Sequence, residues 1–232
     1  MKFLVISDIH GNLENLDKLE PRFREADAVL FGGDFALFGH GETAKPALEK
    51  LLSKHEVIYA VLGNCDSPDF LDEIESADIS VQRTIVFNDG YAVSGSGGGS
   101  RFTGETPFER TDEELVADFA VVDSSSGECA SEDGRWRNLM LIMHNPPKDT
   151  NCDVVPGGIH VGSASLRAFI EKRAPFLVVT GHIHESAAID NIGSSVVINP
   201  GSLAEGKYGW VVAEKAADGF WSVVSAELLR LG

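Results

Sequence analysis

The stretch Phe3-Leu4-Val5-Ile6-Ser7-Asp8-Ile9-His10 decides the fold of this chain. A short apolar run containing valine and isoleucine predicts a buried strand over residues 3–7, and it leads directly into an aspartate and a histidine. Apolar side chains then recur at helical spacing, at Leu13, Leu16, Leu19 and Phe23. The chain therefore opens as a strand, a polar loop and a helix.

The same unit recurs twice in the first third of the chain. Residues 28–31 predict a second strand, followed by a glycine-rich turn and a helix over about 42–53. Residues 57–62 predict a third strand, with a short helix near 68–74. Strands that alternate with helices pair in parallel, so this part of the chain predicts a parallel sheet.

The rest of the chain has a different pattern. Asn88-Asp89-Gly90 separates two apolar runs and predicts a β-hairpin, since Asp-Gly supplies the positive φ of a tight turn. The other segments predict a helix over 115–122, an exposed loop over 124–134, strands over 139–143 and 176–180 around a helix over 163–173, and antiparallel strands over 196–198, 210–213 and 221–226. We expect a single α/β domain over residues 1–232, with two sheets and the helices outside them.

The charge of the chain restricts its partners. It carries 36 acidic and 19 basic residues, a formal net charge of -17. Such a surface repels long polyanions, because an extended nucleic-acid footprint needs a basic stripe. A small phosphate ester remains a suitable substrate, since bound divalent cations reverse the sign of the local field.

Membrane insertion and a disulfide framework are not expected. The sequence has no run of about 18 apolar residues, and Asp8 interrupts the first apolar stretch too early for a signal peptide. The three cysteines, Cys65, Cys129 and Cys152, are far apart and odd in number. We therefore expect a cytoplasmic protein with reduced thiols and no membrane partner.

Five predicted strands end in residues that bind metals. These strand ends are Asp8 with His10, Gly33-Asp34, Gly63-Asn64-Cys65-Asp66, His144-Asn145, and Gly181-His182-Ile183-His184. Open α/β sheets bind their ligands at the carboxyl ends of strands, so these side chains should lie together. A mixture of carboxylate oxygen and imidazole nitrogen suits Mn, Fe or Zn better than Ca.

These motifs, in this order, resemble the calcineurin-like metallophosphoesterase superfamily, in particular its small prokaryotic Icc-related and YfcE types. The resemblance implies a four-layer α/β/β/α sandwich of two mixed sheets flanked by helices. It also implies two divalent metal ions, with Mn²⁺ expected first and Fe, Zn or Ni as alternatives. Asp8, His10 and His184 would hold one ion, Asn64, His144 and His182 would hold the other, and Asp34 would bridge them.

The reaction implied by this resemblance is hydrolysis of a phosphate ester by a hydroxide that bridges the two ions. The sequence agrees in offering neither a nucleophile elbow nor a P-loop. Asn64 and Asp66 are the candidate catalytic residues besides the ligands. We expect Asp66 to orient His144 or another ligand through a hydrogen bond.

Cys65 departs from the pattern of many relatives, in which a histidine at this position can protonate the leaving group. A thiol is a poorer acid for that step. His160, and after it His40, are the candidates to supply the proton instead. The candidate substrate contacts are Cys65, Arg101, His160 and Ser202, the last from the segment Asn199-Pro200-Gly201-Ser202.

The leading interpretation is a hydrolase of a small phosphodiester or phosphomonoester, with the diester preferred. Two alternatives stay open: a nuclease, and a non-enzymatic interaction subunit on the same fold. The charge argues against the nuclease, and the full set of ligand types argues against the inactive subunit. A homo-oligomer also stays open, because the hairpin near Asn88 and the tail strands offer edges that pair.

Overall fold

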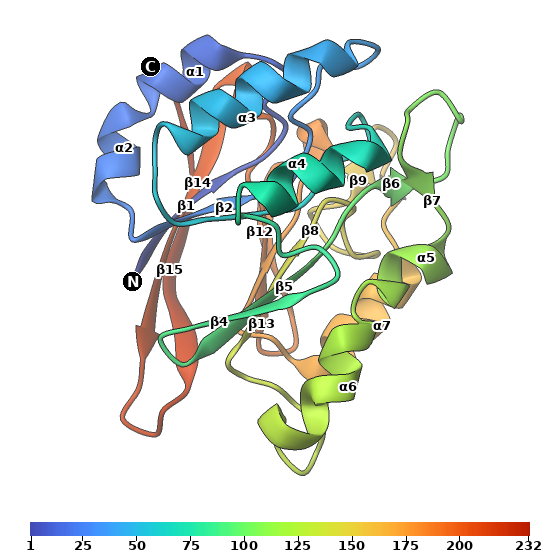
Figure 1. The fold of residues 1–232 in the computed structure, drawn as a ribbon. Coiled ribbons are helices and arrows are strands. Elements are labelled where there is room, and N and C mark those ends of the chain that lie inside the picture. Colours follow the sequence, from blue (N-terminus) through green and yellow to red (C-terminus); the bar gives the residue numbers. More distant parts are fainter.

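Two mixed β-sheets form the centre of the structure (Figure 1). The computed structural model describes residues 1–232, except for the side chain of Glu128. The first sheet has the strand order β15-β14-β1-β2-β3, and the second has the order β12-β13-β11-β8-β5-β4. Both sheets contribute strand ends to the candidate site, so their arrangement determines its geometry.

The first sheet contains the three strands expected at the start of the chain. Its strands are β1 (Lys2–Ile6), β2 (Ala28–Phe31), β3 (Ile58–Ala60), β14 (Lys207–Lys215) and β15 (Trp221–Arg230). Strands β1, β2 and β3 pair in parallel, while β14 runs antiparallel to both β1 and β15. The parallel core predicted from the first third of the sequence is confirmed.

The second sheet has a parallel centre and an antiparallel strand at each edge. Its strands are β4 (Ile85–Asn88), β5 (Tyr91–Ser96), β8 (Leu139–Met143), β11 (Leu177–Val179), β12 (Ala188–Ile192) and β13 (Ser195–Asn199). Strand β8 lies parallel to β5 and β11, and β4 and β12 close the two edges antiparallel. Two short pairs lie outside the sheets: β6 (Gly99–Ser100) with β7 (Glu109–Arg110), and β9 (Val154–Val155) with β10 (Ile159–His160).

Helices cover the outer face of each sheet. Figure 1 shows α1 (Leu13–Lys18), α2 (Glu20–Glu25), α3 (Ala44–Leu52) and α4 (Leu71–Ser76) on one side, and α5 (Asp112–Ala117), α6 (Ala120–Cys129) and α7 (Ala164–Arg173) on the other. Four short 3₁₀ turns complete the chain: Gly41–Thr43, Pro68–Phe70, His184–Ser186 and Leu203–Glu205. Among the helices that the structure describes, none combines the length and apolarity needed to cross a bilayer.

The side-chain alternation of a strand explains this layering. In β1, Phe3 and Val5 pack into the core between the sheets, whereas Leu4 and Ile6 pack beneath the helices of the first sheet. A third core joins the outer face of the second sheet to Phe119 and its neighbouring helices. Because both faces of such a strand are buried, its sequence is a continuous apolar run and does not alternate between apolar and polar residues. The four-layer α/β/β/α sandwich of two mixed sheets is confirmed.

Three local expectations were wrong. The helix expected over 13–23 breaks at Leu19 into α1 and α2, since Pro21 has no N–H to continue the helical hydrogen bonds. Of the loop expected over 124–134, residues 124–129 are helical in α6, where the hydroxyls of Ser124 and Ser126 donate to carbonyls one turn back, and only residues 130–134 lie outside any helix or strand. Strand β13 is antiparallel to β12 but lies parallel to β11 on its other side.

The core between the sheets allows a matched test of burial. Val179 is fully buried there, whereas Val224 on β15 is 58% exposed. We expect Val179→Ala to lower the free energy of unfolding by about 2 kcal/mol, from lost burial and a residual cavity. The control Val224→Ala should change it by less than about 0.5 kcal/mol. Urea denaturation measures both values, and equal losses would contradict this description of the core.

Candidate metal centre

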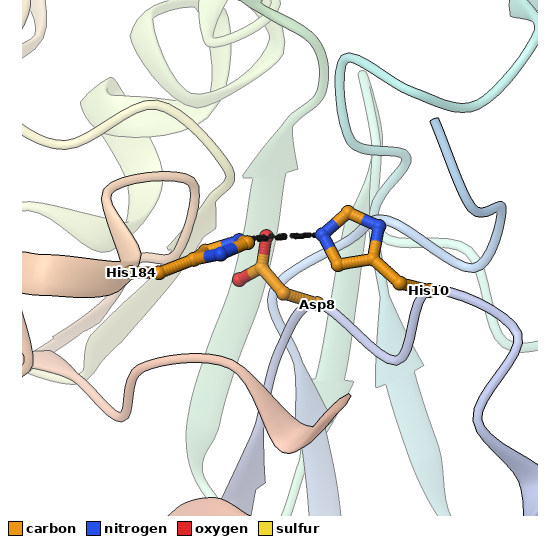
Figure 2. Close-up of side chains that lie close together, drawn as sticks. All are labelled: Asp8, His10 and His184. Atoms are coloured by element: carbon orange, nitrogen blue, oxygen red, sulfur yellow. Dashed lines mark hydrogen bonds and ion pairs between the residues drawn. The ribbon is translucent and has the colours of Figure 1, made fainter. Parts of the chain in front are cut away.

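Asp8, His10 and His184 form a cluster at the carboxyl end of β1. Figure 2 shows the Asp8 carboxylate between the two imidazole rings. His184 Nε2 lies 3.0 Å from Asp8 Oδ1, and His10 Nε2 lies 3.3 Å from His184 Nε2. Asp8 is fully buried and the two histidines are partly buried. Asp8 and His10 thus share one point with His184, which follows more than 170 positions later in the chain, and the three residues present three potential ligand atoms to it.

Asp34 connects this cluster with a second one. Its Oδ2 lies 3.8 Å from His10 Nε2 and 3.5 Å from His144 Nε2. The same nitrogen of His144 lies 2.8 Å from Asn64 Oδ1. The His182 ring lies beside that of His144, with 5.1 Å between centroids. The structure therefore brings together all seven residues expected as ligands.

The tautomers of two histidines show that this donor set fits cations. His10 Nδ1 lies 2.9 Å from the carbonyl of Ala36, and His144 Nδ1 lies 2.7 Å from the carbonyl of Gly32. A carbonyl only accepts, so each Nδ1 carries a proton, and an imidazole that binds a cation then directs its Nε2 lone pair into the site. These lone pairs face carboxylate and amide oxygens, which are also acceptors. A divalent cation between them removes this repulsion, and carbonyl-bound imidazoles are typical of metal ligands.

The backbone is strained at four of these residues. Asp8, His10, Asp34 and His182 have φ values of 56°, 46°, 63° and 66°, in the left-handed region that side chains with a Cβ disfavour. Backbone hydrogen bonds hold the strained loops in place, from Asp8 N to Gly33 O at 2.8 Å and from His10 N to Asp34 O at 3.1 Å. Such strain persists only where the surrounding structure fixes the backbone, so the packing around these loops holds the ligand residues in place.

Two glycines make room for the ligands. A Cβ at Gly63 would overlap the carboxylate of Asp34, and a Cβ at Gly181 would overlap Ser7 and approach Asp8 Oδ2. These positions accept only glycine because a backbone passes directly against a carboxylate. This is the physical reason for the glycines that precede ligand residues in the sequence.

Burial and neighbouring charges set the protonation of the cluster. Burial alone would raise the pKa of Asp8, but the hydrogen bond from His184 and the charges of the neighbouring histidines together outweigh it and hold this pKa well below its usual range. Burial also disfavours a charged His184, yet its hydrogen bond to Asp8 and the surrounding carboxylate charges together raise the pKa of His184 to about 9. Burial and the neighbouring His144 lower the pKa of His182 to about 3, which leaves it neutral. In the absence of an ion, a proton on His184 therefore balances the Asp8 charge.

Asp66 supports the loop that carries Asp34. Its carboxylate accepts hydrogen bonds from the backbone N–H groups of Asp34, Phe35, Ala36 and Gly63, at 2.8 to 3.2 Å. Burial and the charge of Asp34 raise the pKa of Asp66, while these N–H donors oppose the shift. Of the two expected partners, His144 or another ligand, Asp66 contacts the other ligand, Asp34, because the His144 ring proton faces the Gly32 carbonyl. Asp66 thus orients the Asp34 loop rather than that imidazole.

Cys65 lies against Asp34. The backbone N–H of Cys65 donates to Asp34 Oδ1 at 2.8 Å, and the residue is 7% exposed. Burial, together with the Asp34 charge, raises the pKa of the Cys65 thiol. A neutral thiol with a raised pKa is a weak proton donor.

The other candidate substrate contacts lie in different surroundings. Arg101 is exposed and lines a cavity together with Asn64 and His182. His160 lies on β10, where its Nδ1 is 2.7 Å from the buried Asp153, and it lines a neighbouring cavity with Lys148. Ser202 is fully buried, and its hydroxyl donates to the backbone carbonyl of Asp8 at 3.0 Å. Ser202 therefore supports the Asp8 loop instead of facing a substrate.

Two carboxylates with positioning roles were missed in the sequence. Asp153 accepts hydrogen bonds from Thr150, Gly162 and His160. The Glu109 carboxylate accepts hydrogen bonds from the backbone N–H groups of Phe102 and Gly104, and so fixes the loop that contains Phe102. Glu109 lies in the segment Thr106-Pro107-Phe108-Glu109, but nothing in its spacing indicates which backbone it binds. Only the folded loop supplies that information.

The fold and the cluster of carboxylate and imidazole donors define a metal-dependent phosphoesterase. The chain belongs to the calcineurin-like phosphoesterase family, whose model matches residues 1–186. It is 34% identical to the uncharacterized protein MJ1162 of Methanocaldococcus jannaschii, over 86% of this chain and 88% of that protein.

Solved structures share the fold at lower identity. TT1561 of Thermus thermophilus is similar with a TM-score of 0.70 and 20% identity, over 100% of this chain and 99% of that one. A dimetal phosphatase from Danio rerio is similar with a TM-score of 0.61 and 12% identity, over 100% and 99% of the two chains. At these identities, the similarity concerns the fold.

Metal content tests the donor set directly. We expect His184→Ala to reduce the Mn²⁺ bound per chain, measured by inductively coupled plasma mass spectrometry after dialysis, because a ligand atom is removed. His40 is exposed and its ring lies against Glu42, outside the cluster, so His40→Ala is a matched control that should keep the wild-type content. Equal metal content in wild type and His184→Ala would contradict the assignment.

The Asp153–His160 pair predicts a pH dependence. The hydrogen bond to Asp153 raises the pKa of His160 above its ordinary 6.5. A raised pKa means that this pair stabilises the fold fully below pH 6.5, and that the contribution disappears as the pH rises through the folded value. We expect Asp153→Asn to lower the pKa of His160 in an NMR titration of the imidazole. An unchanged titration curve would show that Asp153 does not hold the charged ring.

Proposed function

We propose that this protein hydrolyses a small phosphate ester, a phosphodiester in preference to a monoester. Two divalent cations, Mn²⁺ first among them, would supply the nucleophile by lowering the pKa of a water held between them, and would neutralise the phosphoryl charge. The observation that carries the proposal is the position of Asp34 Oδ2, which lies within 4 Å of both His10 Nε2 and His144 Nε2.

The ligand groups follow from this position. Asp8, His10 and His184 would hold one cation, because their ligand atoms already converge. Asn64, His144 and His182 would hold the second, and Asp34 would belong to both. Asp66 contributes by fixing the Asp34 loop through backbone N–H groups, so that the shared carboxylate needs no rearrangement when a substrate binds.

Asn64 and Arg101 are placed to bind the phosphoryl group. Both residues line the cavity that opens beside the cluster. The Asn64 amide and the Arg101 guanidinium can donate hydrogen bonds to phosphoryl oxygens, and the planar guanidinium matches two of them. Because both donors line the same cavity, they can bind the oxygens of a single phosphate group of the substrate.

The surroundings of Cys65 restrict the leaving group. Cys65 is buried against Asp34, and a thiol is a poorer acid than an imidazolium for protonating a leaving group. His160 lines the neighbouring cavity rather than the cluster itself. We therefore infer that the preferred esters have leaving groups acidic enough to depart without a strong acid, such as aryl alcohols. The net charge of -17 further favours a small ester over a long nucleic acid.

An assay panel with a single ligand variant tests this function. We expect the Mn²⁺-loaded protein to hydrolyse bis-p-nitrophenyl phosphate faster than p-nitrophenyl phosphate or cyclic nucleotides. Asp34→Ala should lower kcat/KM by more than about a hundredfold, since losing even an outer partner of a metal ligand costs roughly 10- to 100-fold. If the loaded wild type hydrolyses none of these esters, the proposal fails and a non-enzymatic role becomes the better interpretation.

A further inference from the structure

A cavity of about 570 Å³ opens beside two of the candidate ligands. Asn64 and His182, two of the candidate ligands, line it together with Arg101. Cavities of this size enclose an organic group of the size of a small ligand. An ester whose phosphate lies at the metal centre would direct one of its organic groups into this space.

Apolar side chains from two separate segments line the cavity. Phe102, in the loop after β6, is 93% exposed, and Ile159, at the start of β10, is 60% exposed. Val155 and Val161 from the β9–β10 region complete the wall. Single exposed apolar residues are common on protein surfaces, but several that gather around the opening beside a polar centre indicate a binding surface.

The loop that presents Phe102 is held by a defined set of hydrogen bonds. The Glu109 carboxylate accepts from the N–H groups of Phe102 at 2.8 Å and Gly104 at 3.0 Å, and from the Thr106 hydroxyl at 3.1 Å. The N–H of Phe108 donates to the carbonyl of Asn64 at 3.0 Å. The loop is therefore attached to Asn64, which also lines the cavity, and these hydrogen bonds fix the backbone from which Phe102 extends.

The charges of the cavity disfavour a second anion. Glu109 and Glu185 line it together with one cation, Arg101. Arg101 also lies 3.7 Å from Glu114, which offsets part of its charge. A further phosphate or carboxylate on the organic group would meet this negative field, whereas an uncharged ring would not.

We propose that this cavity binds an uncharged aromatic ring of the substrate, with Phe102 and Ile159 as the residues that determine specificity. The inference rests on the proposed function, because it assumes that a phosphate occupies the metal centre. An aromatic ring offers its face to the Phe102 ring and its edge to the aliphatic side chains. The substrate class is thus an aryl-bearing phosphate ester with no second charge on the aryl group.

Binding of phosphonates tests the cavity separately from catalysis. Phenylphosphonate and methylphosphonate carry the same anionic group and differ only in the ring. We expect the Mn²⁺-loaded wild type to bind phenylphosphonate about tenfold more tightly in isothermal titration calorimetry, as one well-packed ring contributes about 1.4 kcal/mol. The ring of 4-carboxyphenylphosphonate carries a charge at its far end, so this ligand should bind more weakly than phenylphosphonate.

The double variant Phe102→Ala/Ile159→Ala should lose the preference for phenylphosphonate and keep its affinity for methylphosphonate. Phe87→Ala is the matched control, since Phe87 is an exposed phenylalanine on β4, outside this cavity. It should bind both ligands like the wild type.

Three results would overturn the proposal: equal affinities in the wild type, a preference that survives in the double variant, or an equal loss for both ligands. Tighter binding of the carboxylated ring would overturn the restriction to uncharged groups. Failure of the proposed function would appear instead as an absence of ester hydrolysis, whatever the ratio of phosphonate affinities.

Discussion

The convergence of hydrogen-bond acceptors at one edge of two sheets is the constraint on which this structure depends. Nε2 lone pairs of His10 and His144 face the carboxylates of Asp8 and Asp34 and the amide oxygen of Asn64. Such groups repel each other in a buried place unless a proton or a cation lies among them. Divalent cations would remove this repulsion, so the donor set fits the metal ions that the family implies.

Several features of the fold serve to hold these acceptors. The left-handed backbone at Asp8 and Asp34 costs about 1–3 kcal/mol for each residue, and it persists only where the surroundings fix it. Asp66 binds the loop of Asp34 through backbone N–H groups, and Ser202 binds the carbonyl of Asp8. The three apolar cores anchor the strands from which these loops extend. The burial of apolar side chains in the layers thus offsets the cost of the left-handed backbone at the site.

The metal centre and the cavity beside it contribute different parts of the activity. The centre is built from the ends of strands in both sheets, and this arrangement belongs to the family fold. The cavity is built from the loop around Phe102 and from the β9–β10 region, which lie outside the two large sheets. Loops can change in sequence without disturbing the layered core. We therefore attribute the general reaction to the strands and the choice of ester to these two segments.

The sequence by itself determined the strands and the residue types at their ends. Apolar runs that stop at Asp8, Asp34, Asn64, His144 and His182 specify both a buried sheet and a polar edge, because local hydrophobic pattern and strand direction carry that information. This pattern did not predict the helix break at Leu19, which depends on Pro21. It also did not predict that residues 124–127 are helical, which depends on serine hydroxyls that donate to carbonyls within the helix. Only the tertiary structure decided that Asp66 binds the Asp34 loop, that Ser202 is buried behind Asp8, and that Phe102 and Ile159 share one cavity. These contacts join residues far apart in the chain, so their geometry is set by the packing of the layers and not by any local pattern.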